Sequence, residues 1–529
     1  MSQSVDLDQP APVSAEETGQ MTHRQILEAL SGLLLAMFVA MLSSTIVTNA
    51  LPRIVADLDG SQTGYTWVVV ATLLAMTATT PIWGKLADLF SKKLLVQSAL
   101  VIYSVGSVVA ALAPNMEVLI GARVIQGLGV GGLTALVQVV IASMVTPRER
   151  GRYSGYIGAV FAVATVSGPL LGGLIVDSPL GWRGTFFATL PIALFAFVVL
   201  QAKLHLPVVR RDVSIDYLGA TLLVGGVSLL LVWVSLAGQQ FDWLSTQTYL
   251  LVAAGVVLLA AAIWVEGRVA KDPIIPLRLF RDRTTALATT ASVLIGLAMF
   301  GATVYLSEYF QNARGMSPTQ AGLMSICMVG GLLVSSIVSG RIISNTGRWK
   351  GWLVGGMVLV IAGLALLGTL DATTHLVAIG ASMALLGLGL GATMQNLILA
   401  VQNNTAQADM GAASSVVAFF RSMGGSIGVS ALGAVLAHQV SDKVLAGLAD
   451  LGVDGGHQTG SIPDLADLPA PVRAIYETAF GEATGHLFLI AVPFAVLALV
   501  CVLFIREVPL RTTLDRDELA PEVRAELGD

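Results

Sequence analysis

The sequence predicts an all-α, polytopic membrane protein with fourteen membrane-spanning helices. Of the 529 residues, 55% are hydrophobic and only 12% are charged. A water-soluble protein carries about twice that share of charged residues. Apolar runs of about 18 residues or more recur along most of the chain, and each is long enough to cross a bilayer. The net charge of -5 and the scattered basic residues give no support to nucleic-acid binding.

The apolar runs set the predicted spans, at about 20 residues for each crossing. They cover 26–50, 64–83, 95–113, 117–146, 154–176, 185–203, 216–237, 247–266, 284–307, 319–340, 351–369, 375–402, 411–438 and 485–505. The polar, mildly acidic first 25 residues do not match a signal peptide. Both cysteines, Cys327 and Cys501, lie within apolar runs, so we expect no disulfide, metal site or cofactor.

The distribution of positive charge orients the predicted helices. Loops and tails on the side of the amino terminus hold 22 of the 29 lysines and arginines, whereas loops on the other side hold five. Positively charged loops remain in the cytoplasm, and an even number of spans returns the chain to its starting side. We therefore expect a multi-pass protein of the cell membrane with both termini in the cytoplasm.

An internal repeat at an offset of 256 residues divides the chain into two halves. The matched pairs are Gly84 with Gly340, Lys92 with Arg348, Gly168 with Gly424, and Gly172 with Gly428. The predicted units are a tail (1–25), a six-helix half (26–203), two inserted helices with linkers (204–283), a second six-helix half (284–505) and a tail (506–529). The second half includes an outer loop (439–484) with a short helical run near 471–483, which we interpret either as a flexible loop or as a cap over the outer mouth.

The loop between the second and third spans combines a glycine, an acid and several lysines. Gly84 allows a tight turn or a close helix contact. Asp88 can face the positive N-terminal end of another helix or pair with an arginine. A solvated loop whose lysines only set the topology is the plain alternative.

Two arginines lie inside predicted spans. Arg123 is about six residues into the fourth span and Arg421 about ten into the thirteenth, roughly 9 and 15 Å deep. Because a charge in hydrocarbon costs several kcal/mol, both should face a cavity or a buried partner. Both are candidates for proton coupling, and Arg123 has a structural alternative in which it binds backbone carbonyls.

No acid is expected at a depth comparable with that of the arginines. Glu308 closes the ninth span at the outer interface and is the best candidate for a proton carrier, because burial tunes the titration of a carboxyl group. A solvated charge at a helix end is the alternative. Candidates for a substrate cavity are Asn49, Gln126, Gln138, Gln395 and Asn396, with Phe300, Tyr305 and Phe420 as aromatic walls. Ordinary packing is the alternative for each aromatic residue.

Several motifs resemble those of major facilitator superfamily transporters. The run from Gly84 to Lys93 resembles the inner loop of that family, although Leu89 stands where a basic residue is usual and Ser91 where glycine is usual. The stretch that begins at Arg123 resembles its R-x-x-Q-G motif. In the fifth span the antiporter motif G-P-x-x-G-G is matched by Gly168, Pro169, Gly172 and Gly173. Proline there kinks the helix, and the glycines allow close packing.

Two further stretches resemble the fourteen-helix drug:proton antiporters of the QacA/EmrB-like branch. Residues 42–52 resemble its helix 1 motif, but Ser43 stands where that branch usually has aspartate. The stretch around Arg421 resembles its R-x-x-G-G-x-x-G motif. The missing acid leaves the identity of the proton carrier open.

The resemblance implies a proton-coupled exporter of amphipathic, often cationic, compounds that alternates access between the two sides of the lipid bilayer. It implies an inner gate formed by Gly84, Asp88, Lys92, Lys93 and Arg152. We expect a monomer without nucleic-acid partners. Three alternatives remain: an exporter of lipids or of specialised antibiotics or metabolites, an uncoupled facilitator or uptake carrier, and a membrane sensor or scaffold that transports nothing. An enzyme is not expected, and no phosphate loop supports ATP-driven export.

Overall fold

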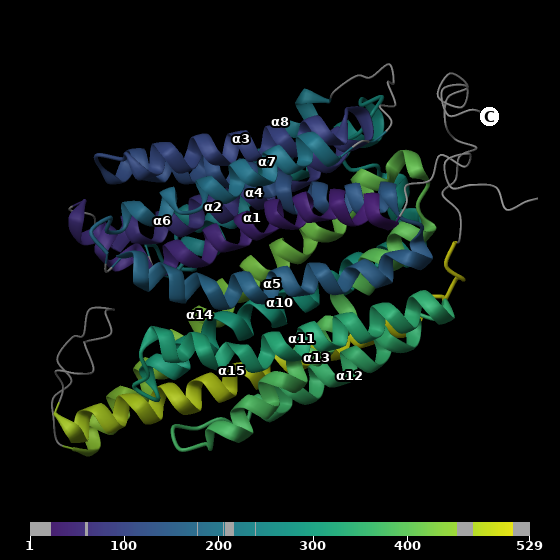
Figure 1. Cartoon of the computed structure of the whole chain (residues 1–529). Helices are drawn as coiled ribbons and strands as arrows, with labels where there is room; N and C mark the ends of the chain where they lie inside the picture. Colours follow the sequence, from purple (N-terminus) through teal and green to yellow (C-terminus); the bar gives the residue numbers. More distant parts are fainter. Residues whose placement is uncertain are drawn as a thin grey trace, which may run out of the picture.

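The computed structural model describes residues 23–58, 62–176, 178–204, 206, 216–238, 240–451 and 469–511. These residues form helices and the connections between them, and no β-sheet is found within these ranges. Fourteen segments in the described ranges are long and apolar enough to cross a membrane, which confirms the predicted number. Most of the helices run roughly side by side along one direction (Figure 1).

The helices fall into three sets along the chain. The first set is α1 (His23–Asp57), α2 (Gln62–Leu89), α3 (Lys92–Ala111), α4 (Met116–Met144), α5 (Pro147–Val176), and α6 (Arg183–Phe187) with α7 (Leu190–Lys203), which form one span together. The inserted pair is α8 (Tyr217–Leu236) and α9 (Thr246–Arg268). The last set is η1 (Leu277–Arg281), α10 (Arg283–Asn312), α11 (Pro318–Thr346), α12 (Lys350–Leu367), α13 (Leu376–Asn404), η2 (Gln407–Asp409), α14 (Met410–Asp450) and α15 (Ala470–Phe504).

Local sequence signals explain where several helices begin. Ser91 and Asn115 accept backbone N–H bonds at the starts of α3 and α4, as N-cap residues do. Ser317 and Gln320 form a capping box at the start of α11. Helix α11 is followed by Gly347, whose φ of 73° is a left-handed conformation that glycine adopts readily and that ends the helix.

The first and last sets pack in the same pattern. Helix α4 lies against α2 and α3, and α13 lies against α11 and α12 in the same way. Helix α5 packs on α1, as α14 packs on α10. These pairs follow the 256-residue offset of the sequence repeat. We call the two sets the N-half and the C-half.

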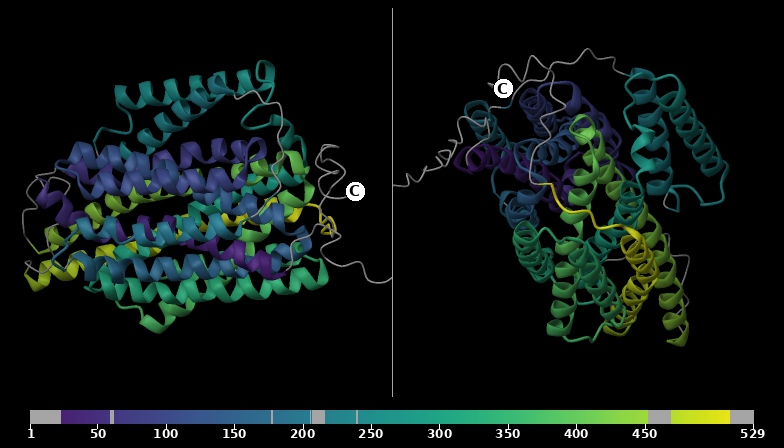
Figure 2. Two further views of the ribbon diagram at one scale, coloured as in Figure 1. Left: turned by 45° about the horizontal axis from the view of Figure 1, so that its top comes forward. Right: turned by 90° about the vertical axis from the view of Figure 1, so that its right-hand side faces the viewer.

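The inserted helices α8 and α9 lie at the edge of the bundle, where Figure 2 shows them as a separate pair. Helix α8 contacts α2 and α14. A small apolar cluster joins them, in which Leu223 and Val227 of α8 meet Val416 and Phe419 of α14. The insertion therefore touches both halves rather than only one.

The outer loop that the sequence predicts at 439–484 is helical at both of its ends. Helix α14 continues to Asp450 and α15 already begins at Ala470, so the predicted spans 411–438 and 485–505 are too short. The extension of α14 buries Val440, Val444 and Leu448 at the four-residue spacing of a helical stripe. Lys443 forms an ion pair with Glu482 across this distal hairpin, which comprises 439–451 and 469–484. The choice between flexible loop and cap now concerns 452–468, which lie outside the described residues.

Candidate functional site

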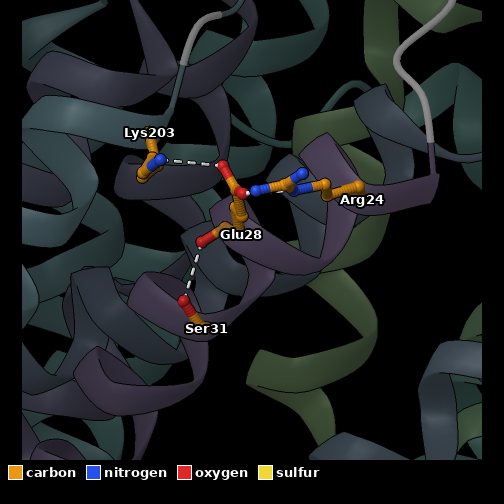
Figure 3. A network of polar contacts seen from close by, with 4 residues as sticks. All are labelled: Arg24, Glu28, Ser31 and Lys203. Atoms are coloured by element: carbon orange, nitrogen blue, oxygen red, sulfur yellow. Dashed lines mark hydrogen bonds and ion pairs between the residues drawn. The ribbon is translucent and has the colours of Figure 1, made fainter.

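The first turn of α1 and the end of α15 lie at the same end of the bundle, which we call the termini end. Near the start of α1, Glu28 binds Arg24 at 3.1 Å and Lys203, the last residue of α7, at 2.9 Å (Figure 3). Beyond α15, the carbonyl of Pro509 accepts a bond from Asn403 at the end of α13. The start of α1 thus lies beside the end of the sixth span, and the end of the last span lies beside the end of the twelfth. Each pair is separated by an even number of spans, as the sequence predicts.

Asp88 joins the two halves at the termini end. Its carboxylate accepts hydrogen bonds from the backbone N–H groups of Gly411, at 2.7 Å, and Ala412, at 2.8 Å. These groups belong to the first turn of α14, where the helix dipole favours a negative charge. The interpretation that Asp88 faces the positive end of another helix is confirmed.

Gly84 lies one turn before Asp88 and allows this contact. A Cβ atom at Gly84 would lie 2.6 Å from the carbonyl oxygen of Gly411 and would overlap the side chain of Ser415. Any larger residue would therefore separate α2 from α14.

The three basic residues predicted for this gate are not brought together around Asp88. Lys93 donates to the carbonyl of Gln201 on α7 at 2.7 Å, which is a contact within the N-half. Arg152 is exposed on α5, while Lys92 is half-buried at the start of α3. Lys92 is one turn from Asp88 along the chain and is the basic residue of this set whose charge acts on that carboxylate.

A second connection between the halves involves Arg150, which sequence reasoning missed. Its buried guanidinium donates to the carbonyls of Val145 and Ala142 and, at 3.0 Å, to Oε1 of Gln402 on α13. The Nε2 of Gln402 donates in turn to Ser414 on α14 at 2.9 Å. The three bonds of this guanidinium, one of which crosses between the halves, fix its position in the gate.

A sequence signal for Arg150 was present. Helix α5 begins at Pro147, seven residues before the predicted start, and Pro is favoured in the first turn of a helix. Thr146 and Glu149 are spaced as in a capping box, and their side chains are bonded at 3.2 Å. Because each helical residue turns by about 100°, Arg150 and Arg152 point in different directions.

The neighbouring Arg148 forms a third connection. It donates to the carbonyls of Ser344, at 3.1 Å, and Asn345, at 3.0 Å, near the end of α11. Helices α5 and α11 touch at Gly151 and Gly340, and a Cβ atom at Gly151 would lie 2.5 Å from the carbonyl oxygen of Gly340. The two backbones meet because neither residue has a side chain.

Two of the predicted cavity residues meet across the halves. Nε2 of Gln138 on α4 lies 3.2 Å from Oε1 of Gln395 on α13. They line a small pocket together with Arg150, Gln402 and Ile157. The hydrogen bonds described here between the two halves lie toward the termini end. The structure is therefore closed at that end.

Arg123 is held entirely by the N-half. Its Nε donates to the carbonyl of Val68 at 3.1 Å and its Nη1 to Oε1 of Gln126 at 2.9 Å. Gln126 donates to Ser107 at 2.8 Å and is 0% exposed. These contacts match the structural interpretation of Arg123, and they place Gln126 inside a helix packing interface rather than in an open cavity.

Glu308 and Arg421 are two charged residues within the membrane-spanning helices. Glu308 is half-buried on α10 and Arg421 half-buried on α14, and neither side chain has a hydrogen bond within the described residues. By comparison, the Glu266 carboxylate accepts two backbone N–H bonds and Asp409 binds Arg278. A charge of this kind within a span needs access to water or to a bound ligand.

Phe420, which precedes Arg421 in α14, packs against other aromatic rings. The Phe420 ring meets those of Phe419 and Phe280 edge to face, with centroids 5.1 and 6.2 Å away. In contrast, Phe300 packs onto Gly425, and the Tyr305 hydroxyl donates to the carbonyl of Val429. Phe300 and Tyr305 therefore fasten α10 to α14.

The remaining predicted residues are mostly engaged in packing. Asn396 is buried and donates to the carbonyl of Ala392 at 2.7 Å in its own helix. A Cβ atom at Gly168 would overlap Thr45 of α1, so the antiporter motif is a close helix contact here. Gly172 is buried, whereas Gly173 has open space beside it. The side chains of Asn49 and Pro169 lie outside the described residues.

Comparisons with known proteins agree with this architecture. The family described as Major Facilitator Superfamily matches residues 33–429. Multidrug transporter protein MdtP of Bacillus subtilis is 32% identical over 534 residues, which is 96% of this chain and 97% of MdtP. Efflux pump dotC of Dothistroma septosporum is 34% identical over 506 residues, covering 94% of this chain and 86% of the pump.

A solved structure supports the fold. The proton:xylose symporter XylE aligns with a TM-score of 0.62 at 14% identity, over 92% of this chain and 97% of XylE. At that identity the likeness concerns the fold alone. Together with the family match and the fourteen spans, it leads to one conclusion. The chain belongs to the major facilitator superfamily and is a multi-pass membrane transporter, not an enzyme.

Proposed function

We propose that this transporter exports amphipathic, often cationic, compounds from the cell in exchange for protons. The observation that carries this proposal is the similarity to the multidrug transporter MdtP, which extends over nearly the full length of both chains. The similarity to the efflux pump dotC points in the same direction of transport. Protons and small amphipathic molecules are the partners, and a monomer in the lipid bilayer is sufficient for the mechanism.

The orientation follows from the charge distribution. With 22 of 29 lysines and arginines on the side of the amino terminus, the termini end faces the cytoplasm in a cell membrane. The gate formed by Asp88, Arg150 and the Gly151–Gly340 contact then closes the transporter toward the cytoplasm. Rocking of the two halves breaks these contacts and admits cargo from the cytoplasm or the inner leaflet.

Glu308 is the proposed proton carrier. Arginines stay protonated, so Arg123 and Arg421 set the local charge but do not carry the proton. A carboxyl group without a described hydrogen bond can hold either a proton or a cationic cargo, but not both. Protonation from the outside then releases the cation there, and loss of the proton to the cytoplasm prepares the site for the next cation. Phe280 and Phe420, which pack on each other and are only half-buried, offer apolar contacts to the rest of the cargo.

The test is proton flux in inside-out vesicles on addition of the cationic dye ethidium. We expect dye-dependent proton release from the wild type and its loss in Glu308→Gln. Glu477→Gln is the matched control, because Glu477 is also a half-buried acid but lies in the distal hairpin.

Each other outcome refutes a defined part of the proposal. Dye transport without proton release contradicts coupling and leaves an uncoupled facilitator. Coupled transport that survives Glu308→Gln removes Glu308 as the carrier. Absence of any dye flux, with altered lipid composition in a deletion strain, identifies a lipid exporter instead.

A further inference from the structure

The first turn of α14 is capped by a residue from the other half. Asp409 occupies the N-cap position of α14, from which an aspartate side chain ordinarily accepts the N–H of the second or third helical residue. Those residues are Gly411 and Ala412, and both N–H groups donate to Asp88 of α2 instead. Asp409 makes no capping hydrogen bond of its own. The carboxylates of Asp88 and Asp409 are therefore both near these two amides, but only Asp88 accepts hydrogen bonds from them.

Arg278 holds Asp409 away from these amides. Nη2 of Arg278 lies 2.8 Å from Oδ1 of Asp409. The Asp409 side chain is only 12% exposed and that of Arg278 is 68% exposed, so the pair lies at the edge of the gate. Any opening that removes Asp88 leaves the acidic side chain of Asp409 two and three residues before the vacant amides of Gly411 and Ala412.

Contacts on both sides of Arg278 fix the linker between α9 and α10 in place. The Glu266 carboxylate, near the end of α9, accepts the backbone N–H of Ile274 at 3.1 Å and of Ile275 at 3.0 Å. Phe280, in the same 3-10 turn as Arg278, packs edge to face on Phe420 of α14. The inserted helices are thereby fixed to the N-terminal region of α14 at two points.

We propose that Asp88 and Asp409 exchange as caps of α14 when the gate opens and closes. In the closed state Asp88 caps α14 from the other half, and Arg278 is the positioning residue that keeps Asp409 away. When the halves separate, Asp409 leaves Arg278 and accepts the N–H groups of Gly411 and Ala412. Because backbone N–H groups need a partner in both states, the exchange keeps the open and closed states close in energy. The inference rests on the proposed movement of the halves but not on proton coupling or cargo.

The exchange predicts that Asp409→Asn and Asp409→Ala act differently. Both substitutions remove the ion pair with Arg278 in the closed state. Asparagine keeps one acceptor oxygen for these amides, so Asp409→Asn still caps α14 in the open state, whereas alanine cannot. We expect the ratio of open to closed molecules to be about fivefold lower in Asp409→Ala than in Asp409→Asn. Arg278→Gln frees Asp409 to compete with Asp88 and raises the open fraction.

The measurement is a distance distribution between spin labels on the full chain in lipid nanodiscs. Leu94→Cys and Thr346→Cys place labels on exposed positions of opposite halves, near the termini end. The native Cys327 and Cys501 are replaced by serine. Asp88→Asn, which weakens the gate directly, defines the distances of the open state.

The results separate the cap exchange from a simple ion pair. The expected pattern is a raised open fraction in Arg278→Gln and Asp409→Asn and a lower one in Asp409→Ala. The double variant of Arg278→Gln with Asp409→Ala should match Asp409→Ala alone. Equal ratios in the Asn and Ala variants would overturn the exchange, because a simple ion pair does not distinguish them. If Asp88→Asn also leaves the distances unchanged, the proposed movement of the halves is overturned with it.

Discussion

Replacing Asp88 by asparagine should shift the transporter toward the state that is open at the termini end. Asp88 accepts two backbone N–H bonds at the N-terminus of α14. Asparagine keeps one acceptor oxygen but turns an NH2 group toward the second N–H. The loss of one charge-assisted bond costs about 2 kcal/mol, and the lost interaction with the helix dipole about 1 kcal/mol. Together these favour the open state by roughly 100-fold.

The assay is the labelling rate of a cysteine that is buried only while the gate is closed. Ile157 is 3% exposed and lines the small pocket between the halves. In a chain without Cys327 and Cys501, Ile157→Cys should react with a membrane-impermeant maleimide in proportion to the open fraction.

The matched control for Asp88→Asn is Glu117→Gln, an exposed acid in the first turn of α4 at the other end of the bundle. It should leave the labelling rate at Ile157→Cys unchanged. If Asp88→Asn also leaves that rate within about twofold of the parent, the two hydrogen bonds do not hold the gate, and the reasoning is wrong.

Three further predictions use the same chain. Gln402→Met removes the acceptor of the buried Arg150 guanidinium and should raise gate labelling about tenfold; an unchanged rate would mean that water replaces this bond. Gly340→Ala forces α5 and α11 apart and should also raise the labelling, whereas Gly330→Ala, with open space beside it on α11, should not; equal effects would contradict the close contact. Glu266→Gln should speed hydrogen exchange of the amides that it binds in the α9–α10 linker about tenfold, measured by mass spectrometry, and unchanged protection would show that the linker holds itself.

The fold was accessible from the sequence because a bilayer imposes long apolar runs. The number of spans followed from that constraint, and the contact of Asp88 with a helix N-terminus was one of the two contacts that the loop motif suggested. The helical run near 471–483 is confirmed as the start of α15. The extension of α14 was missed because polar residues such as Lys443 interrupt the apolar run, although the buried stripe of α14 continues past them. The predicted span ends at residue 438, where the sequence becomes amphipathic, whereas the helix itself continues to Asp450.

The candidate site was only partly accessible, because burial depends on which helices meet. We predicted Arg152 as a gate residue, but Arg150 takes that place. Which of the two faces the other half depends on the rotational position of each residue on α5, which the helix start at Pro147 sets. Nothing in the sequence places Gln126 under Ser107 or joins Gln138 to Gln395. Those contacts arise from tertiary packing between segments that are distant in the chain.

Helix α14 is one continuous helix of 41 residues, which makes it about 60 Å long. Its first turn binds Asp88 and its last turns form the distal hairpin with α15. If α14 tilts as a rigid body, a displacement of one end produces a displacement of the other end. In the proposed orientation, the gate at the cytoplasmic end is therefore coupled through α14 to the distal hairpin on the outside of the cell. An antibody fragment that clamps the distal hairpin would arrest transport without crossing the membrane or touching the cargo path.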